Sequence, residues 1–337
     1  MSKIKIGFIG AGGIVKNRHI PGFQKIEDVE FFGICNRSTE SSQLIADEFN
    51  IQKVFNTPDD LINDPNIDLV VIGTWPYKHC EYTIKSLDAK KHVFVQARMC
   101  MDLNEAQSMV AKAQEHSELT TMICPSPFAF SADMLLRKLM NESFVGDLIS
   151  VNYISHAKYS PDAKINWRHK HEFSGLNIMG MGIYYETISR WIGHPETVFA
   201  VKNTSVKERD NDQDQAEQVD VEDGVIITGL LKKGGFYNYQ FSSSHHANDD
   251  QIRICGTEGT IVFNFNNDSL EAGKKGEDLK QLQTPTDLQK TWQVEEELID
   301  SIKTGKQYES SFEEGLKYMT FTQAVHDSFK EQKCIKI

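Results

Sequence analysis

The segment HVFVQARM runs from a short apolar stretch into residues whose types suit chemistry on a bound ligand. His92–Val95 is typical of a buried strand, and Gln96, Ala97 and Arg98 follow it directly. Open α/β sheets bind ligands at the carboxyl ends of their strands, so this triplet marks a candidate site. Arg98 is a permanent cation that can stabilise an alkoxide-like oxygen or bind a carboxylate or phosphate. The alternative is that Arg98 pairs with a surface carboxylate.

The turn GAGGIV, close to the N-terminus, is a second candidate site. Gly10 and Gly12 match the first two glycines of the dinucleotide-binding pattern G-x-G-x-x-G, and Val15 stands at the third position. Gly10 permits a tight turn, and Gly12 allows backbone to approach a pyrophosphate. Gly13 and Ile14 are expected to open a helix whose N–H groups favour phosphate. Val15 is expected to hold this helix slightly further from its strand.

The second strand ends in CNRS, which bears on the choice between NAD and NADP. A carboxylate at this strand end would hold the ribose 2′-hydroxyl of NAD and repel a 2′-phosphate. Asn36 removes that repulsion, and Arg37 offers a guanidinium fork to the phosphate. The pair therefore favours NADP. The alternative is that Asn36 binds a plain ribose while Arg37 is a solvated loop residue.

The elements that position these residues alternate between short apolar runs and helical patterns. The runs predict strands over Ile4–Ile9, Val29–Cys35, Leu69–Ile72, His92–Val95 and Thr121–Cys124, with helices over Ile14–Gln24, Thr39–Phe49, His79–Leu87 and Leu103–His116. Runs such as LVVI suit strands buried on both faces. Residues 1–125 are therefore expected to form a doubly wound parallel sheet, a Rossmann domain that binds NAD(P).

The remaining residues, 126–337, show a different pattern. DGVIITGLLKKGGFYNYQFSS predicts two strands joined by a Lys-Lys-Gly-Gly turn. VKERDNDQDQAEQVDVED is acidic and lacks apolar periodicity, so it is interpreted as a solvated loop. The pair His245-His246 has no third ligand at a suitable spacing and is interpreted as a surface pair.

Composition excludes several classes of function. The chain has 337 residues and a formal net charge of −12, which argues against nucleic-acid or anionic-membrane partners. No apolar run approaches the roughly 20 residues that span a bilayer. The first residues lead directly into a strand, so no signal peptide is expected. The six cysteines are scattered, which favours a cytoplasmic protein with buried thiols and no metal site.

The chain resembles the Gfo/Idh/MocA family, named for glucose–fructose oxidoreductase, inositol dehydrogenase and their relatives. The resemblance extends along nearly the whole length of the chain. It is carried by the glycine turn and by the segments IDLVVIGTWPYKH, KHVFVQARM, SGLNIMGMGIYYETISRWIG, ICGTEGTIVF and EEGLKYMTFTQAVHDSF. It implies a second domain, 126–337, of the α+β class with a large, open, mostly antiparallel sheet and a closing helix near 310–333. The exposed face of that sheet implies a homo-oligomer, a dimer or a tetramer.

The family's catalytic motifs are altered in this chain. The E-K-P triplet, whose lysine supports the substrate hydroxyl and the cofactor, falls on Gln96, Ala97 and Arg98. In the D-x-G-x-H motif, the aspartate falls on Gly180 and the histidine on Tyr184. Arg98 can replace the missing charge, but an arginine hardly ever deprotonates and is a poor acid or base.

Further cofactor contacts follow from the same resemblance. The family's T-P-N loop is changed to Thr74-Trp75-Pro76, while His79 keeps its place. The resemblance implies that Thr74, Trp75 and His79 contact the cofactor, together with Gln96 and Ala97 at the next strand end.

Tyr184 is the candidate for proton transfer in the histidine's place. A phenol can donate to a developing alkoxide, and a nearby cation would lower its pKa. The alternative is a core tyrosine that packs its helix; the neighbouring Tyr185 is interpreted as structural. Candidate substrate contacts precede or open the same helix: Trp167, Arg168, His169, His171 and Asn177. His169 and His171 are also spare acid–base groups, and Asn177 has a helix N-cap as its alternative role.

Three functions fit these residues. The first is an NAD(P)-dependent dehydrogenase or reductase that acts on a hydroxyl or ketone of a sugar, polyol or sugar-derived small molecule. The second is a cofactor-binding regulator without catalysis, which the loss of the motif's lysine, aspartate and histidine favours. The third is a lyase or hydrolase that uses a bound nicotinamide for transient oxidation. Turnover without consumption of external cofactor would single out the third.

Overall fold

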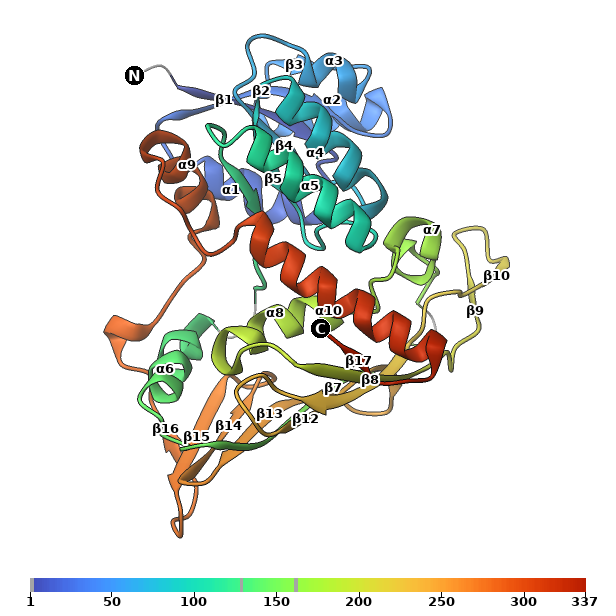
Figure 1. Ribbon diagram of the computed structural model, residues 1–337. Coiled ribbons are helices and arrows are strands. Elements are labelled where there is room, and N and C mark those ends of the chain that lie inside the picture. The colour runs from blue at the N-terminus through green and yellow to red at the C-terminus, as the bar shows by residue number, and fades with distance from the viewer. Residues whose placement is uncertain (1–2, 128–129, 161–162) are drawn as a thin grey trace. The chain divides into compact units, whose positions relative to one another are not determined.

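The computed structural model describes residues 3–127, 130–160 and 163–337 (Figure 1). The chain divides into two units: Met1–Pro125 with Gln293–Met319, and Ser126–Trp292 with Thr320–Ile337. The boundary near residue 125 lies where the sequence places it. Residues 293–319, however, were expected in the second domain and belong to the first unit.

The first unit contains six parallel strands in the order β3-β2-β1-β4-β5-β6. Their bounds are β1 Ile4–Ile9, β2 Val29–Cys35, β3 Lys53–Val54, β4 Leu69–Ile72, β5 His92–Val95 and β6 Thr121–Ile123. The four residues of β4 are fully buried, as expected for a central strand covered on both faces. The predicted Rossmann arrangement is therefore confirmed, with β3 as a strand that the sequence pattern did not reveal.

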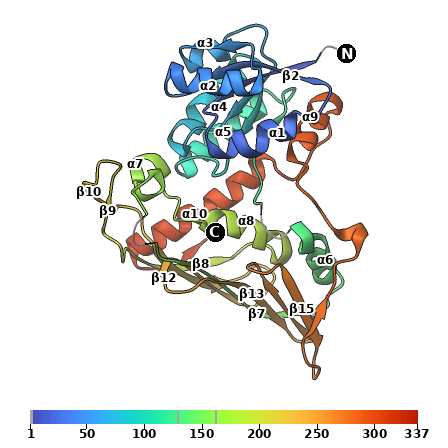
Figure 2. The same cartoon turned by 180° about the vertical axis from the view of Figure 1, so that it is seen from behind.

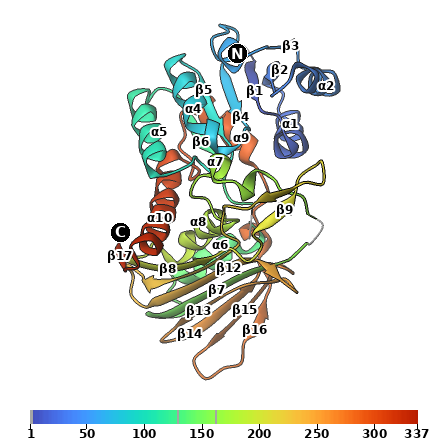
Figure 3. The ribbon, with the colours of Figure 1, turned by 90° about the vertical axis from the view of Figure 1, so that its right-hand side faces the viewer.

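Helices cover both faces of this sheet, with α4 and α5 on one side and α1 and α2 on the other (Figure 3). The bounds are η1 Val15–His19, α1 Ile20–Phe23, α2 Thr39–Phe49, α3 Pro58–Ile62, η2 Pro76–Lys78, α4 His79–Asp88, α5 Leu103–Glu115, α9 Val294–Thr304 and α10 Phe312–Glu331, the last shared with the second unit. Ser38, Thr57 and Asp102 start α2, α3 and α5 as N-caps. The first predicted helix differs: η1 is a π-helical turn, and α1 is one α-helical turn.

A buried contact between a histidine and a glutamate explains why α9 belongs to the first unit. Glu295 in the first turn of α9 is 1% exposed, and its Oε1 lies 2.5 Å from Nδ1 of His19, which is 0% exposed. Gly22 leaves room for this contact, because a Cβ there would lie 2.6 Å from the Glu295 carboxylate. The two partners are 276 positions apart in the chain, so no local pattern predicts their meeting.

The second unit contains a nine-stranded sheet in the order β16-β15-β14-β13-β7-β12-β11-β8-β17. The strands are β7 Leu148–Lys158, β8 Thr197–Asn203, β11 Gly224–Leu230, β12 Phe236–His245, β13 Asp249–Gly256, β14 Gly259–Asn264, β15 Ser269–Lys274, β16 Lys280–Leu282 and β17 Ile335–Lys336. All neighbours pair antiparallel except β7 and β12. The predicted strand pair is β11 and β12, joined by a turn in which Gly234 and Gly235 adopt positive φ.

The acidic segment predicted as a loop instead contains a small hairpin. β9 Glu208–Asp210 and β10 Ala216–Gln218 pair antiparallel and form a separate two-stranded sheet. Each strand is only three residues long, and its alternation is exposed, intermediate, exposed, without an apolar face. The prediction was therefore wrong because backbone pairing, not burial of apolar side chains, orders these residues.

Helices of the second unit lie on one face of the large sheet, as Figure 1 and Figure 2 show for α6 Phe130–Asn141 and α8 Met181–Ile192. Shorter helical turns are η3 Trp167–His169, α7 His171–Ser174 and η4 Thr286–Leu288. The other face exposes apolar side chains: Ile149, Phe199, Val201, Ile226, Leu230 and Phe236. Among the described helices, none is long and apolar enough to cross a bilayer.

Candidate active site

The strand order places four predicted ligand-binding segments side by side in the first unit. Because β2, β1, β4 and β5 are adjacent and parallel, their carboxyl ends form one edge. That edge carries the Asn36-Arg37 pair, the glycine turn, the Thr74 loop and the Gln96-Ala97-Arg98 triplet, in that order. The sheet therefore brings together the residues that the sequence predicts for a dinucleotide.

The glycines of this turn differ in backbone conformation and in how closely other atoms approach them. Gly10 has φ +80°, and a Cβ there would lie 2.8 Å from the backbone nitrogen of Thr74. Gly12 and Gly13 differ, because a Cβ at either position would meet no described atom within 4 Å. Ile14, at the start of the helix, is 54% exposed. The turn is thus shaped by Gly10 and leaves open space beside Gly12 and Gly13.

Val15, which replaces the third glycine of the pattern, packs into space left by a second glycine. Its side chain is 2% exposed. The residue after β4 is Gly73, and a Cβ there would lie 2.3 Å from Cγ2 of Val15. Gly73 therefore provides the space for a methyl group of Val15, and the expected effect of Val15 on the distance between helix and strand stays a prediction.

Asn36 holds the glycine turn in place. Its Oδ1 accepts a hydrogen bond from the backbone N–H of Ala11 at 2.7 Å, and its Nδ2 donates to the carbonyl of Ser41 at 3.1 Å. The carboxamide thereby links the end of β2 to the turn after β1 and to α2. This structural role was not predicted, and it leaves the approach to a 2′-substituent to the next residue, Arg37.

Arg37 and Trp75 lie together at this edge. Arg37 is exposed, and its guanidinium carbon lies 5.3 Å from the centre of the Trp75 ring, within the range of a cation–π contact. One residue follows β2 and the other follows β4. They form a flat cationic and aromatic surface of the kind on which a purine base stacks.

The loop after β4 is held by His79 and leaves a hydroxyl without a partner. Nδ1 of His79 lies 2.8 Å from the carbonyl of Arg98, and Nε2 lies 2.9 Å from the carbonyl of Thr74. Burial lowers the pKa of His79, whose side chain is 0% exposed, and its two ring nitrogens link two loops. The Oγ1 of Thr74 is buried and has no hydrogen-bond partner within the described chain.

Gln96 belongs to a buried chain of hydrogen bonds. Glu295 contacts Nδ1 of His19, Nε2 of His19 contacts Nε2 of Gln96, and Oε1 of Gln96 accepts from the backbone N–H of Ala97 at 3.0 Å. If Nδ1–H donates to Glu295, Nε2 is the acceptor for the amide, and the orientation of Gln96 is determined. A glutamate at 96 would have no N–H to donate, which gives a physical reason for the change from the family's residue.

Arg98 is buried rather than solvated. It is 4% exposed. The next residue, Met99, donates its backbone N–H to the hydroxyl of Tyr318 on α10. Ala97 is partly exposed at the strand end. Ala97 and Arg98 are therefore fixed on both sides, by Gln96 before them and by Met99 after them.

The predicted substrate residues of the second unit lie in the segment before α8. Arg168 is exposed, with its guanidinium carbon 4.3 Å from the Trp167 ring centre. Nδ1 of His169 accepts from the backbone N–H of Asn166 at 3.1 Å, closing a capping box, and Nδ1 of His171 lies 2.9 Å from the carbonyl of Gly175. Both histidines therefore use one ring nitrogen to stabilise the local backbone.

Asn177 is not a helix N-cap. Helix α8 begins at Met181 with Gly180 as its N-cap residue. Asn177 is 2% exposed, and its Nδ2 donates to the carbonyl of Ser174 at 2.6 Å. The carboxamide is thus held inside the turn that leads into α8.

The hydroxyl of Tyr184 is hydrogen-bonded to a carboxylate. Its hydroxyl donates to Oδ2 of Asp250 at 2.6 Å, and the hydroxyl of Tyr153 donates to Oδ1 at 2.8 Å. Burial raises the pKa of Tyr184, and the charge of Asp250 raises it further. The expectation of a lowered pKa was therefore wrong. Tyr185 has the structural role expected of it, with its ring stacked 3.9 Å from that of Phe321.

The change at the motif's aspartate position is coupled to the change at its histidine. A Cβ at Gly180 would lie 3.0 Å from Cε2 and 3.1 Å from Cδ2 of Tyr184. A larger side chain at 180 would therefore push against the tyrosine ring. Asp250 and Tyr153 were not predicted as site residues; the available indication was an acidic residue at 250 that shares a strand face with the apolar Ile252 and Ile254.

His245 also has an unexpected neighbour. Its ring stacks on that of His156, with centroids 3.8 Å apart and an interplanar angle of 13°. The prediction of a surface pair with His246 is thus incomplete, because the contact of His245 is across strands β12 and β7.

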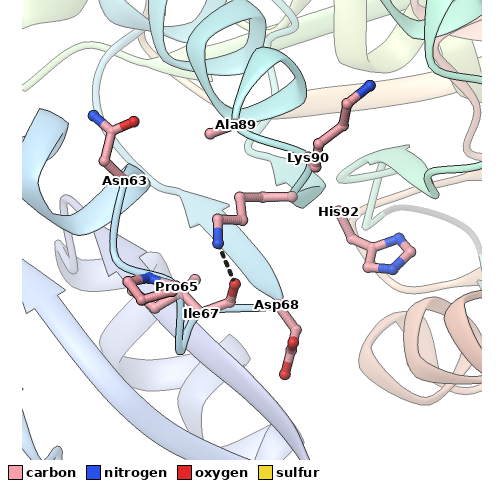
Figure 4. A pocket seen from close by; sticks show the side chains of 8 residues that line it. Asn63, Pro65, Ile67, Asp68, Ala89, Lys90 and His92 are labelled. Carbon is pink, nitrogen blue, oxygen red and sulfur yellow. Dashed lines mark hydrogen bonds between the residues drawn. The ribbon is translucent and has the colours of Figure 1, made fainter.

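One hollow of about 530 Å³ lies at the opposite edge of the parallel sheet (Figure 4). It is lined by residues that precede β4 and β5: Asn63, Pro65, Ile67, Asp68, Ala89, Lys90, Lys91 and His92. Lys91 donates to the carbonyl of Ile67 at 2.7 Å and to that of Asp64 at 2.9 Å, and burial lowers its pKa. The ammonium is thus used to close the amino-terminal edge, away from the predicted site.

The carboxyl edge of the first unit fits a dinucleotide. Open space beside Gly12 and Gly13 leaves the backbone accessible to a pyrophosphate at a helix start. The unpartnered hydroxyl of Thr74 offers a hydrogen bond, and the Arg37–Trp75 surface offers a face for a base. These features come from three different strand ends, so they indicate a ligand that extends along the edge.

Known proteins share both sequence and fold with the chain. The model of an oxidoreductase family with an NAD-binding Rossmann fold matches residues 4–123, and that of the GFO/IDH/MocA C-terminal domain matches residues 134–262. The scyllo-inositol 2-dehydrogenase (NADP(+)) of Bacillus subtilis is 23% identical, over 99% of this chain and 96% of that protein. The myo-inositol 2-dehydrogenase of Thermotoga maritima is 23% identical, over 99% of this chain and 98% of that protein.

A solved structure of levoglucosan dehydrogenase in its apo form has a TM-score of 0.89 to this chain at 19% identity, covering 100% of this chain and 99% of the other. At that identity the likeness concerns the fold. It agrees with a parallel-sheet unit followed by a unit with a large, mostly antiparallel sheet. With family models matched over most of its length, the chain belongs to the Gfo/Idh/MocA family of NAD(P)-binding oxidoreductases.

Proposed function

We propose that the protein oxidises a hydroxyl of a sugar, polyol or sugar-derived small molecule, or reduces the corresponding ketone, with NAD(P) as the redox partner. The observation that carries the proposal is the open backbone at Gly12 and Gly13 beside a helix start of the Rossmann sheet. Relatives named for inositol, levoglucosan and 1,5-anhydro-D-fructose support carbohydrate-like substrates.

In this proposal the carboxyl edge of the first unit binds the dinucleotide. Gly10 shapes the turn, and the backbone from Gly12 to Ile14 faces the pyrophosphate. Thr74 donates its buried hydroxyl to the ligand, and Trp75 supports the base. When bound, the nicotinamide supplies the group that accepts or donates a hydride. Gln96 and Ala97 border its site, with Gln96 oriented by His19.

We propose that NADP is preferred over NAD. Asn36 carries no charge to repel a 2′-phosphate, and its Oδ1 accepts from Ala11. Arg37 is exposed beside the same strand end and has a flexible cationic fork. The name of the Bacillus subtilis relative, which specifies NADP(+), is consistent with this preference.

The catalytic roles are assigned to Arg98 and Tyr184. Arg98 stabilises negative charge on the reacting oxygen, since a buried guanidinium has a strong field there. Tyr184 passes the hydroxyl proton. Trp167 and Arg168 contact the substrate through their shared cationic and aromatic surface, and the remaining substrate contacts are His169, His171 and Asn177.

Two measurements test this function. The first is the affinity of the purified protein for NADH and NADPH, followed by the quenching of protein fluorescence. The second is the change in absorbance at the reduced-nicotinamide band with NAD⁺ and NADP⁺ against inositols, anhydro-sugars, aldoses and ketoses. Binding with turnover is expected. Binding without turnover on the panel would favour the regulator, and turnover of a C–O bond without net cofactor consumption would favour the lyase.

We propose that the open face of the nine-stranded sheet forms a homo-oligomer. Val201 on β8 pairs with Ile226 on β11, and both are about half exposed, at 53% and 48%. Leu230 pairs with Phe236 in the same way, at 53% and 51%. Apolar surface in this continuous arrangement is typical of a protein interface.

Sedimentation velocity tests the oligomer. Val201→Glu with Ile226→Glu is expected to reduce the sedimenting mass to that of one chain. The matched control is Leu44→Glu, at an exposed leucine on α2 of the first unit, 70% exposed, which should leave the mass unchanged. A wild-type protein that sediments as one chain would contradict the proposal directly.

A further inference from the structure

Three residues of the second unit are joined by hydrogen bonds between their side chains. Asp250 on β13 accepts from Tyr184 on α8 at 2.6 Å through Oδ2, and from Tyr153 on β7 at 2.8 Å through Oδ1. Strands β7 and β13 are antiparallel neighbours, and the Tyr153 and Tyr184 rings lie 5.3 Å apart. Both carboxylate oxygens are therefore held by phenols from different elements.

The Asp250 residue is partly buried and has apolar side chains nearby. Ile252 and Ile254, which follow Asp250 on the same face of β13, are 0% exposed. Phe265 lies 5.6 Å from both the Tyr153 and the Tyr184 rings. A carboxylate among such groups costs folding free energy unless it is well hydrogen-bonded. Here both carboxylate oxygens accept hydrogen bonds from phenols, which offsets that cost.

Burial shifts the pKa of Asp250 and of both tyrosines. Burial raises the pKa of Asp250, and Asp249 beside it adds to the rise, while the hydrogen bonds from Tyr184 and Tyr153 oppose it. Burial and then the charge of Asp250 raise the pKa of both phenols. Tyr184 therefore keeps its proton in neutral solution and does not act as a phenolate base.

A phenol that donates to a carboxylate can still pass a proton. Its oxygen has two lone pairs besides its O–H bond, so it accepts one proton while releasing its own. The release is directed to Asp250, because the O–H already points along the 2.6 Å hydrogen bond to Oδ2. Tyr184 then never carries a charge.

We propose that Asp250 is the terminal proton acceptor of the reaction and that Tyr184 relays the proton to it. This inference rests on the proposed function. In the oxidation direction the substrate O–H and C–H bonds and the Tyr184 O–H bond break. A new Tyr184 O–H bond, an Asp250 O–H bond and the carbonyl π bond form. The C–H electron pair leaves as the hydride that NAD(P)⁺ accepts, so the charges balance.

The same proposal explains the altered family motif. The aspartate position is Gly180, whose missing side chain leaves room for the Tyr184 ring. The carboxylate that helix α8 lacks is supplied by Asp250 from the neighbouring sheet. Tyr153 is a positioning residue. It donates to Oδ1 of Asp250 and so keeps Oδ2 directed toward Tyr184.

The relay predicts a specific pH dependence. Asp250 must be ionised to accept the proton, so kcat/KM for oxidation rises with pH through its raised pKa and is lost below it. The hydrogen bond from Tyr153 favours the ionised form, so Tyr153→Phe moves the midpoint to higher pH. The other ionisable groups nearby are Asp249, and His156, which pairs with Asp249 across the strands and stacks on His245.

The test uses Asp250→Asn and Tyr184→Phe in the full-length protein. Each is expected to lower kcat by about 10²- to 10⁴-fold, the usual range for a proton-transfer group. The double variant should lose no more than the slower single variant. The matched control is Tyr239→Phe: Tyr239 lies in the same aromatic cluster, 6.3 Å from the Tyr153 ring, and its hydroxyl has no partner among the described residues. It should retain wild-type kcat.

A second measurement does not depend on turnover. Carbon-13 NMR of protein labelled at the aspartate side-chain carboxyl follows the titration of Asp250, assigned by its absence in Asp250→Asn. Its midpoint is expected above the ordinary value of 3.8 and higher still in Tyr153→Phe. Asp250→Glu should restore part of the activity that Asp250→Asn loses, and circular dichroism reports whether each variant folds.

The outcomes separate the relay from the function. If the wild type turns over a polyol and Asp250→Asn is as active as Tyr239→Phe, the relay is refuted while the function stands. A midpoint at or below 3.8 that does not move in Tyr153→Phe refutes the relay as well. If the wild type neither binds a dinucleotide nor turns over any substrate, the proposed function fails, and the relay fails with it.

Discussion

Replacement of Gly12 by leucine would test the dinucleotide site with little disturbance of the fold. No described atom lies within 4 Å of a Cβ at this position, and Gly12 is not among the residues with positive φ. A side chain there meets only what binds beside the turn. Gly10 would be a poor choice for substitution. Its φ of +80° strains any residue with a side chain, and a Cβ there would lie 2.8 Å from the backbone nitrogen of Thr74.

The size of the effect follows from the contact that is lost. A hydrogen bond from backbone N–H to a charged phosphate contributes about 1.5–3 kcal/mol. Since each 1.4 kcal/mol is a factor of ten in Kd, Gly12→Leu should weaken NADH and NADPH about 10- to 100-fold. Gly12→Ala, with one methyl group, should fall between the wild type and the leucine variant.

Fluorescence titration with each reduced cofactor measures Kd, and thermal unfolding without cofactor measures the fold. The matched control is Gly224→Ala in β11, where a Cβ would lie 3.7 Å from the carbonyl of Asn203, an ordinary contact. Control and Gly12 variants should unfold within a few degrees of the wild type. A Gly12→Leu protein that folds normally and keeps its Kd within a factor of two would refute the assignment of the pyrophosphate to this turn.

Three further predictions concern other residues of the first unit and Tyr184. Arg37→Asp should weaken the binding of NADPH at least about tenfold more than the binding of NADH, because it removes a charge-assisted contact and adds repulsion. Equal losses of affinity in titrations with both cofactors would reject Arg37 as the discriminating residue. Arg98→Ala should lower kcat while the Kd for the dinucleotide stays within about twofold of the wild type. If Arg98 and Tyr184 act in one transition state, the double variant Arg98→Ala with Tyr184→Phe should lose less kcat than the product of the two single losses. Unchanged kcat in steady-state assays of both single variants would place the chemistry elsewhere. Glu295→Ala should lower the free energy of unfolding by about 3–5 kcal/mol in urea titration, since it leaves His19 buried without its carboxylate. Lys303 lies on the same helix as Glu295, and Lys303→Ala removes its solvent-accessible pair with Asp28. This substitution should cost under about 1 kcal/mol, and similar losses in the two variants would contradict the importance of burial.

The elements predicted well are those determined by neighbouring residues. Continuous apolar runs mark β1, β2, β4 and β5 because both faces of these strands are buried. Strand β3 has only Lys53 and Val54, too short for any periodicity to be visible. The hairpin of β9 and β10 lacks an apolar face, so its composition resembles that of a loop.

The site residues that were missed depend on pairings between distant segments. His19 meets Glu295 across 276 positions, and Tyr184 meets Asp250 across 66. Neither pairing follows from spacing, because each requires one strand order and one helix placement. His79 was predicted to contact the cofactor, and spacing gave no sign that its ring nitrogens also lie at the carbonyls of Thr74 and Arg98.

The contact between Val15 and Gly73 bears on how the glycine pattern evolves. The two positions share a volume that holds one side chain, since a Cβ at 73 would lie 2.3 Å from Cγ2 of Val15. A lineage can therefore place its glycine at either position, provided that the other changes in compensation. The third glycine of the pattern is then a property of the pair, and a search that requires glycine at position 15 would overlook this chain.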